Sequence, residues 1–280
     1  MSTTETGRPQ AVYALGRTPE EYDRLRMQAR VWEDATGRLL DRVALMPGAA
    51  CLDAGCGPGE TMRLMAERTG PAGRVLGIDT DSSLGAMALA TLHAAGHRQC
   101  YFRAHDLTSG EPVPGAPFDL VYARLLLFHL PQRAEVLARL WDAVAPGGHL
   151  VVQDYDIRGI SVLPALASVN ELMRVVTGAF DAAGADVHVG ARLPRLFMEA
   201  GIGHPDGTDV AGRLEPLASG SALLERTFRS VLPTAVAHGI TTEADAAASL
   251  VWIDRDATRF AGCPMTWPLL IGAWKHRELT

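Results

Sequence analysis

A cluster of glycines close behind an apolar run is the feature that most constrains the fold of this chain. The run begins at Ala50 and includes Asp53, and Gly55, Gly57 and Gly59 follow it. Glycine takes positive φ values and lets bare backbone approach a ligand, and an apolar helical period starts directly after the glycines. The pattern predicts a strand, a tight turn that holds a ligand, and a helix. Its Gly-x-Gly-x-Gly spacing is not the Gly-x-Gly-x-x-Gly of dinucleotide-binding proteins, so the turn is not obviously shaped for a pyrophosphate.

Further apolar segments alternate with helical segments after the glycine loop. The expected strands cover residues 74–79, 99–103, 118–123 and 149–155. Repeated β–α units with continuous apolar strands predict a doubly wound, mostly parallel sheet, which binds ligands at the carboxyl ends of its strands. The glycine loop alone would also fit a plain turn, but ordered acids at those ends make a ligand site the stronger interpretation. These acids are Asp53, Asp79, Asp106 and Asp154.

Helical segments precede and follow this predicted core. Thr18 is expected to cap the first helix, with Pro19 in its first turn and Glu21 completing a capping box. Later elements are expected as a long helix over 161–183, a helix over 191–200, a strand over 207–214, a pair of helices within 219–256 and an edge strand over 267–275. We divide the chain into an N-terminal arm with lid helices (1–48), a ligand-binding α/β core (49–156), a helical insertion (157–186), and the rest of the core (187–280) with a second helical insertion at about 216–258.

Composition and charge argue against several classes of protein. The 280 residues carry a formal net charge of −6 and have a pI near 5.8, so nucleic acid is not expected as a partner, because phosphate binding needs a basic face. No apolar run is long enough to span a bilayer, and the polar start lacks the apolar core of a secretory signal. We therefore expect no membrane partner and a cytoplasmic location. Neither a metal site nor a disulfide framework is expected from the spacing of Cys51, Cys56, Cys100 and Cys263.

With these motifs the chain resembles the class I S-adenosylmethionine-dependent methyltransferases, in particular the small-molecule type that includes the ubiquinone-biosynthesis methyltransferases. The resemblance covers residues 50–155 and extends to the segments 118–121 and 140–150, of which the second is similar to the family's helix-turn-strand signature. It implies a Rossmann-like α/β fold with a seven-stranded sheet, an N-terminal helical lid and helical insertions. It also implies S-adenosylmethionine as the cofactor and S-adenosylhomocysteine as its product.

The resemblance places the cofactor at the strand ends. A carboxylate can accept both donors of a ribose diol, and Asp79 lies where the family has the acid that does so. Asp106 is expected to face the adenine amine, Leu107 to offer its backbone N–H to a ring nitrogen, and Thr80 to flank the adenine edge. The amino acid and ribose part of the cofactor is assigned to the loop residues Asp53, Ala54, Gly55, Cys56, Gly57 and Gly59.

The N-terminal segment supplies further candidates. Tyr13, Tyr22 and Arg26 resemble a lid of related enzymes, in which aromatic and basic side chains close over the cofactor. Tyr155 ends the fifth expected strand on the substrate side. We therefore expect Arg26 to bind the cofactor, and Tyr13, Tyr22 and Tyr155 to be catalytic.

Other basic and aromatic residues have more than one interpretation. Arg124 follows the fourth strand, where the family often lines the methionine end of the cofactor, although a structural ion pair would also explain it. His129 stands among leucines and is interpreted as a packed residue, although it faces the active site in some relatives. The weaker pocket candidates near the insertions, each more typical of core or surface, are Trp252, His188 and His204.

The predicted reaction is transfer of a methyl group to a small, largely apolar molecule, which the apolar insertions favour. The acceptor atom is carbon, nitrogen or oxygen, and an aromatic or indole-like secondary metabolite is the expected class. One alternative is a protein that binds the same cofactor without methylating, as a cyclase or a regulatory module. The glycine spacing and Asp106 disfavour a nicotinamide-dependent dehydrogenase. The expected partners are the small-molecule acceptor and, in a homodimer, a second copy of the chain.

Overall fold

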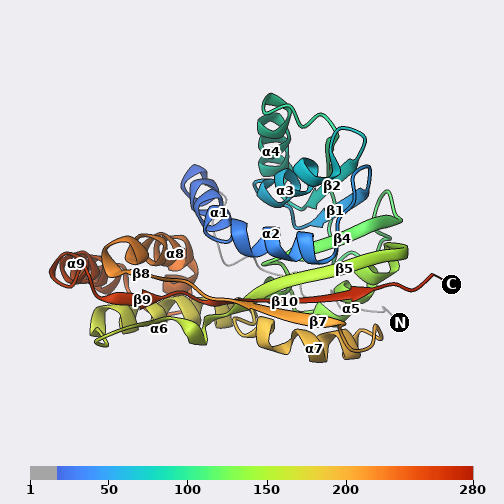
Figure 1. Ribbon diagram of the computed structural model, residues 1–280. Helices are drawn as coiled ribbons and strands as arrows, with labels where there is room; N and C mark the ends of the chain where they lie inside the picture. The colour runs from blue at the N-terminus through green and yellow to red at the C-terminus, as the bar shows by residue number, and fades with distance from the viewer. Residues whose placement is uncertain (1–17, 280) are drawn as a thin grey trace, which may run out of the picture.

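A seven-stranded sheet is the centre of the computed structural model, which describes residues 18–279 (Figure 1). Its strands are β1 (Ala50–Ala54), β2 (Arg74–Asp79), β3 (Cys100–Ala104), β4 (Phe118–Arg124), β5 (Val144–Asp156), β7 (Gly207–Ala211) and β10 (Leu269–His276). Their order is β3-β2-β1-β4-β5-β10-β7. The first five run parallel in this order, whereas β10 is antiparallel to both of its neighbours. The predicted doubly wound, mostly parallel α/β fold is therefore confirmed.

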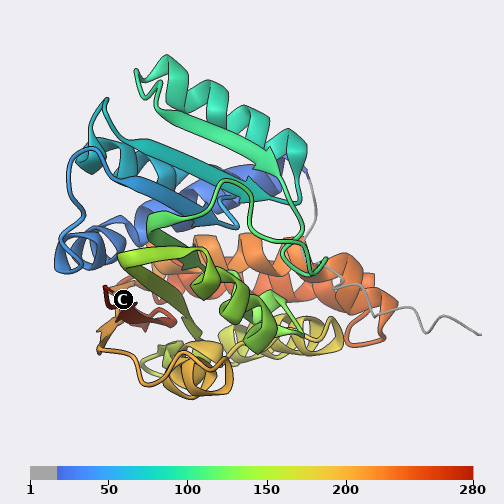
Figure 2. The same cartoon turned by 90° about the vertical axis from the view of Figure 1, so that its right-hand side faces the viewer.

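Helices cover both faces of this sheet (Figures 1 and 2). Successive strand residues point to opposite faces, so Cys51 and Leu52 of β1 belong to different hydrophobic clusters. The Cys51 cluster includes buried leucines and methionines of α2 (Glu33–Arg42) and α3 (Glu60–Thr69). The Leu52 cluster includes α5 (Arg133–Asp142) and α7 (Val189–Glu199), while α4 (Ser82–Ala94) packs against β3.

A helical cap lies beyond the carboxyl ends of the parallel strands (Figure 1). It contains α6 (Ala167–Ala182), α8 (Leu217–Ala237) and α9 (Glu243–Arg259), with a three-stranded sheet of β6 (Ser161–Val162), β9 (Pro264–Thr266) and β8 (Leu214–Pro216). The cap is continuous with the main core, because Leu172, Phe228 and Ile253 are buried in the same cluster as Leu52. The N-terminal helix α1 (Pro19–Val31) packs on α8. The lid helix, the cap and the strand ends thus meet at one end of the sheet.

Local signals explain where the helices around the glycine loop begin. Thr18 caps α1, because its hydroxyl accepts from the Glu21 N–H at 3.3 Å. Asp81 caps α4 by accepting from the N–H groups of Ser83 and Leu84. Gly59 precedes α3 with a φ of 81°, a left-handed conformation that favours glycine. These starts agree with the elements that the sequence predicts there.

Two predictions for the second half of the chain are wrong. Residues 161–166 are not helical, because α6 begins at Ala167 and Ser161–Val162 form β6; Pro164 disfavours helical backbone at the residue before it. The last strand is not an edge strand, because β10 lies between β5 and β7 and leaves β7 at the edge. In addition, the strand expected over 207–214 ends at Ala211.

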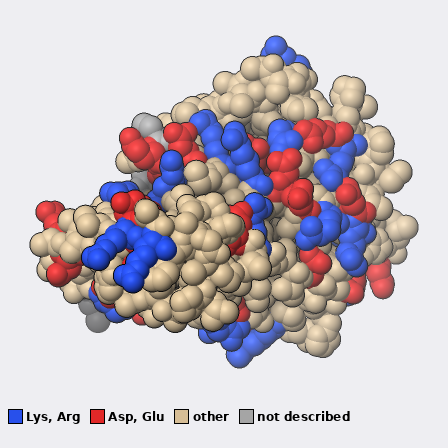
Figure 3. Space-filling view, turned by 60° about the vertical axis from the view of Figure 1, so that its left-hand side comes forward, with Lys and Arg blue, Asp and Glu red and all other residues tan. Residues whose placement is uncertain are grey.

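The charged side chains are mixed on the face shown in Figure 3, where basic and acidic groups are interspersed among uncharged ones. That side of the molecule therefore offers nucleic acid no continuous basic surface. Among residues 18–279, no helix combines the length and the apolar character that crossing a bilayer requires.

Candidate active site

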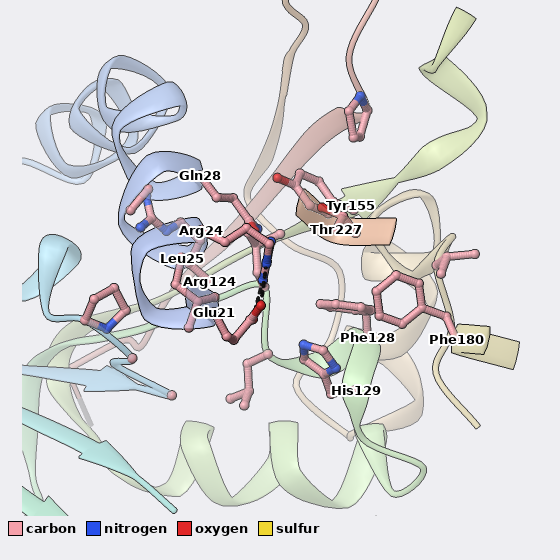
Figure 4. Close-up of a pocket in the computed structure, with 18 of the residues that line it drawn as sticks. Glu21, Arg24, Leu25, Gln28, Arg124, Phe128, His129, Tyr155, Phe180 and Thr227 are labelled. Carbon is pink, nitrogen blue, oxygen red and sulfur yellow. Dashed lines mark hydrogen bonds and ion pairs between the residues drawn. The ribbon is translucent and has the colours of Figure 1, made fainter. Parts of the chain in front are cut away.

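A cavity of about 530 Å³ lies at the carboxyl ends of the parallel strands, between α1 and the cap (Figure 4). One part of it, here called the loop end, is lined by the glycine loop and by the segments that follow β2 and β3. The other part, here called the apolar chamber, is lined by α1, α6, α8 and the segment after β9. Residues of the loop end are Gly55, Cys56, Gly57, Asp79, Thr80, Asp81, His105, Asp106 and Leu107. Apolar side chains of the chamber are Leu25, Phe128, Met173, Val176, Phe180, Leu223, Leu224, Met265 and Trp267.

Of the loop glycines, Gly57 is the one at which bare backbone meets open space. It has a φ of 48°, and a Cβ added there would find no protein atom within 4 Å. A Cβ on Gly55 would instead meet Leu126 at 2.9 Å, and one on Gly59 would meet Ala88 at 3.0 Å. Gly55 and Gly59 therefore serve close packing, whereas Gly57 leaves room for a ligand.

Asp79 connects the end of β2 to the glycine loop. Its Oδ2 accepts from the Gly57 N–H at 2.9 Å, and its Oδ1 accepts from the Asp81 N–H at 3.0 Å. Burial raises the pKa of this carboxyl, and the two backbone donors oppose the rise. Because an ionised carboxylate oxygen has two lone pairs, each oxygen of Asp79 keeps one acceptor site for a ligand hydroxyl.

Asp53 lies behind the glycine loop and does not line the cavity. Its side chain is buried, and its Oδ2 has no hydrogen-bond partner among the described residues. Burial raises the pKa of Asp53 to about 7; Arg124 opposes that rise and Asp79 adds to it. Ala54 is also buried outside the cavity wall, while Cys56 is buried and lines the cavity. The structure thus places Asp53 and Ala54 as support for the loop.

Replacing Asp53 by asparagine should flatten the pH dependence of stability. Between the ordinary carboxyl pKa of 3.8 and about 7, folded Asp53 binds more protons than unfolded Asp53, so the free energy of unfolding falls as the pH rises. An amide of the same shape does not titrate. Urea unfolding of cofactor-free protein from about pH 5 to about pH 8 should show a smaller fall for Asp53→Asn than for the wild type. Equal slopes would show that Asp53 is ionised at low pH in the folded chain.

The segment after β3 completes the loop end. Asp106 is exposed at the cavity wall, and its Oδ1 accepts from both the N–H and the hydroxyl of Thr108. The Leu107 side chain is buried, and its carbonyl accepts from Arg139 at 2.6 Å. Thr80 lines the cavity beside them, as does His105, whose buried Nε2 has no partner among the described residues. His105 was not predicted, although it directly precedes Asp106.

The lid helix α1 brings one predicted residue to the cavity and turns another away. Tyr22 lines the cavity, and its hydroxyl donates to Asp81 Oδ2 at 2.9 Å. Arg26 does not line the cavity but pairs with Asp23 at 3.3 Å on the exposed side of the helix. Because residues three or four apart share a helix face, Arg24 and Gln28 lie on the cavity side and Arg26 does not. Tyr13 lies outside the described residues.

Replacing Tyr22 by phenylalanine should weaken S-adenosylhomocysteine binding about threefold to tenfold, because one side-chain hydrogen bond that fastens α1 to the loop end is lost. Calorimetric titration measures this change, and thermal unfolding should hardly shift. The matched control is Tyr101→Phe, which removes an exposed hydroxyl on β3. Unchanged affinity for Tyr22→Phe would show that this bond does not support the loop end.

The ends of β4 and β5 supply the polar groups between the loop end and the chamber. Arg124 lines the cavity and donates to the Thr36 hydroxyl at 3.0 Å, and it forms no ion pair within residues 18–279. Tyr155 also lines the cavity, and its hydroxyl accepts from Trp32 Nε1 at 2.6 Å. Burial raises the pKa of Tyr155 to about 12, so it stays protonated at neutral pH.

His129, expected as a packed residue, both packs and lines the cavity. Its ring stacks on Phe128 at 3.6 Å between centroids and lies near Phe180. Burial, together with the positive charges of Arg24 and Arg133, lowers the pKa of His129 to about 3, so the imidazole is neutral near pH 7. The cavity wall does not include the weaker candidates Trp252, His188 and His204.

Comparison with known proteins places this site in a family. Residues 51–148 match a family described as a methyltransferase domain. Trans-aconitate 2-methyltransferase of Variovorax paradoxus is 37% identical over 133 residues, which cover 46% of this chain and 49% of that protein. The enzyme of the same name from Methylobacterium radiotolerans is 36% identical over 164 residues, or 58% of this chain and 57% of that protein. The chain therefore spans about half the length of the curated relatives it matches.

A solved structure shows the same fold over more of the chain. An inferred methyltransferase of Bacillus halodurans C-125 superposes with a TM-score of 0.58 and covers 87% of this chain and 98% of that protein. At 15% identity this likeness concerns the fold alone. The domain match, however, contains the glycine loop, Asp79 and Asp106, which form the loop end. Residues 51–148 of the chain thus carry a methyltransferase domain, and the chain is similar to methyltransferases over about half of their length.

Proposed function

We propose that this chain transfers a methyl group from S-adenosylmethionine to a small, largely apolar molecule bound in the apolar chamber. The observation that carries the proposal is the continuity of the cavity, since the glycine loop and the chamber open into one space. A cofactor at the loop end would thus border an acceptor in the chamber without an intervening wall. A separate, walled-off chamber would not support methyl transfer.

The residues of the loop end fit this cofactor. Gly57 leaves open space beside its backbone, and Asp79 keeps acceptor sites for the ribose hydroxyls. Asp106 Oδ2 is directed to no described partner and suits the adenine amine, and the cationic Arg124 suits the methionine carboxylate. When bound, S-adenosylmethionine supplies a methyl group that passes to a nucleophile as the carbon–sulfur bond breaks with its electron pair to sulfur.

The chamber favours an apolar acceptor over a polyanion. Trans-aconitate, the acid named in the curated relatives, carries several carboxylates, and binding it would need unpaired cations besides Arg124, which we assign to the cofactor. Arg24 is instead held by both carboxylate oxygens of Glu21, at 2.8 Å and 2.7 Å, and both residues are buried. His129 is neutral, and the remaining chamber wall is mainly aliphatic and aromatic. We therefore infer an apolar molecule of the size of a small aromatic metabolite.

The side chains of the chamber act chiefly by positioning. Neither Tyr155, with a pKa of about 12, nor His129, with a pKa of about 3, is tuned to remove a proton near pH 7. Apolar side chains of α6 and α8, with Leu25 of α1, exclude water and hold the nucleophile near the loop end, at a near-attack distance of about 3–3.5 Å from the reacting carbon. This favours acceptors that react without a strong base.

Mass spectrometry tests the proposal. The protein is incubated with S-adenosylmethionine and a set of small aromatic phenols, ketones and indoles, and with trans-aconitate. We expect a product heavier by one methylene group from an apolar acceptor, together with S-adenosylhomocysteine, and none from trans-aconitate. Methylation of trans-aconitate instead would overturn the apolar assignment. Tight cofactor binding with no methylated product from any acceptor would favour a non-methylating cofactor-binding protein.

A further inference from the structure

A series of hydrogen bonds links α8 to α1 beside the apolar chamber, and its α1 residues Glu21, Arg24 and Gln28 lie on the cavity side (Figure 4). The Ser230 hydroxyl donates to Glu21 Oε2 at 2.6 Å, and Glu21 holds Arg24 through both carboxylate oxygens. Arg24 donates in turn to Gln28 Oε1 at 2.5 Å. Because a guanidinium has donors only, this contact fixes the orientation of the Gln28 amide.

The oriented amide turns its NH2 group away from Arg24 and leaves it to donate, and Gln28 and Tyr155 both line the cavity. A hydrogen bond from Gln28 is one of the interactions that oppose the raised pKa of Tyr155. Trp32 Nε1 donates to the same hydroxyl oxygen at 2.6 Å. A tyrosine hydroxyl has two acceptor sites and one proton, and Trp32 occupies one of the acceptor sites. Within residues 18–279 the hydroxyl proton of Tyr155 has no acceptor, and Tyr155 lines the cavity.

A second donor on the same wall also has no partner. Trp267 is 5% exposed and lines the cavity, and its Nε1 is buried without a hydrogen-bond partner among the described residues. Trp267 belongs to the same hydrophobic cluster as Trp32, and Tyr155 packs against that cluster. A buried donor left unpaired is costly, so the unpaired Trp267 Nε1 on the cavity wall, together with the Tyr155 hydroxyl, indicates a ligand that brings an oxygen atom to them.

We propose that the acceptor is an apolar molecule with a carbonyl or similar hydrogen-bond-accepting oxygen, which Tyr155 and Trp267 hold by donating to it. This inference rests on the proposed function of the chamber as the acceptor site. Gln28 is a positioning residue, because it occupies the Tyr155 oxygen and so turns the hydroxyl proton toward the ligand. The positive charge of Arg24 polarises the Gln28 amide that accepts from it and so strengthens Tyr155 as a donor.

The test compares two probes that differ in one group, acetylnaphthalene and the ethylnaphthalene of the same substitution pattern. Their binding to protein saturated with S-adenosylhomocysteine is followed by tryptophan fluorescence. We expect the wild type to bind the ketone roughly threefold to tenfold more tightly than the hydrocarbon, which is the effect of one hydrogen bond on affinity. Tyr155→Phe should reduce that preference while leaving the affinity for the hydrocarbon and the cofactor affinity nearly unchanged. Its thermal unfolding temperature should fall, because the buried Trp32 Nε1 loses its acceptor. The control Tyr101→Phe should keep the wild-type preference.

A second variant tests the direction of the series. In Gln28→Glu, measured at about pH 8, the new carboxylate still accepts from Arg24 but can only accept from Tyr155, so it draws the hydroxyl proton away from the ligand. We expect it to reduce the ketone preference as Tyr155→Phe does. An undiminished preference in Gln28→Glu would overturn the positioning role, and an undiminished preference in Tyr155→Phe would overturn the donor role.

The binding assay separates this proposal from the proposed function. If methyl transfer is found and the ketone preference is absent from the wild type, the oxygen-recognition proposal fails and the function stands. Failure of both probes to bind would contradict the assignment of the chamber to aromatic carbonyl compounds. A ketone preference that depends on Tyr155 would support the proposal even if no methylated product is found.

Discussion

Substituting valine for Gly57 is expected to reduce S-adenosylhomocysteine affinity by about 100-fold or more, equivalent to about 2.7 kcal/mol. Gly57 has a φ of 48°, which a β-branched residue strongly resists, and no protein atom lies within 4 Å of an added Cβ. The new side chain would therefore enter the space that we assign to the cofactor. Calorimetric titration of the purified variant measures the loss.

Gly201→Val is the matched control for that change. Gly201 has a φ of 75° and open space around an added Cβ, but it follows α7 and does not line the cavity. It should lower the thermal unfolding temperature by a similar amount and leave S-adenosylhomocysteine affinity unchanged. If Gly57→Val binds the cofactor as the wild type does, the cofactor does not approach the backbone at Gly57.

Asp79→Ala is expected to weaken S-adenosylhomocysteine binding by about 30-fold to 100-fold. Hydrogen bonds to a charged group contribute about 1.5–3 kcal/mol, and this variant loses those to the ribose together with the contact that holds the Gly57 N–H at 2.9 Å. The loss of affinity therefore has two parts. One comes from the missing hydrogen bonds to the ribose, and the other comes from the glycine loop, which is no longer held at Gly57. Titration with S-adenosylhomocysteine measures their sum.

A ligand lacking both ribose hydroxyls separates the two parts. The wild type should bind the dideoxy analogue more weakly than S-adenosylhomocysteine, whereas Asp79→Ala should bind both about equally, because the diol has lost its acceptor. If the variant still discriminates as strongly as the wild type, the ribose lies away from Asp79 and the loss reflects only the changed loop.

The parallel half of the fold and the loop end could be predicted from sequence because their signals are local. The strands β1, β2 and β3 are short and end within two residues of an acid or a glycine, so Gly57, Asp79 and Asp106 are found directly from their position in the chain. Parallel strands then bring these ends together without further information. The three residues do line one cavity.

The antiparallel part of the sheet and the chamber depend on contacts between distant segments. Nothing local to β10 indicates that it enters between β5 and β7, since that pairing joins residues more than a hundred positions apart, such as Tyr155 and Leu270. Trp267 reaches the cavity only because of this pairing and the turn before it. No sequence signal marked it as a chamber residue.

The lid helix α1 shows a second reason why the sequence alone does not identify every cavity residue. The sequence predicted α1 and its Thr18 cap, but the choice of Arg26 over Arg24 required knowing which helix face meets α8. Glu21, Arg24 and Gln28 share one face at spacings of three and four residues, a pattern visible in the sequence but not considered for the cavity. The predicted division into domains and the expected homodimer stay predictions.

Calorimetric titration of the wild type with S-adenosylhomocysteine, and in parallel with NADH, tests most directly whether the loop end is a cofactor site of the methyltransferase kind. We predict saturable binding of S-adenosylhomocysteine to one site, lost in Gly57→Val and kept in Gly201→Val, and no comparable heat with NADH. Saturable binding of NADH without binding of S-adenosylhomocysteine would contradict the assignment of the glycine loop, Asp79 and Asp106 to this cofactor.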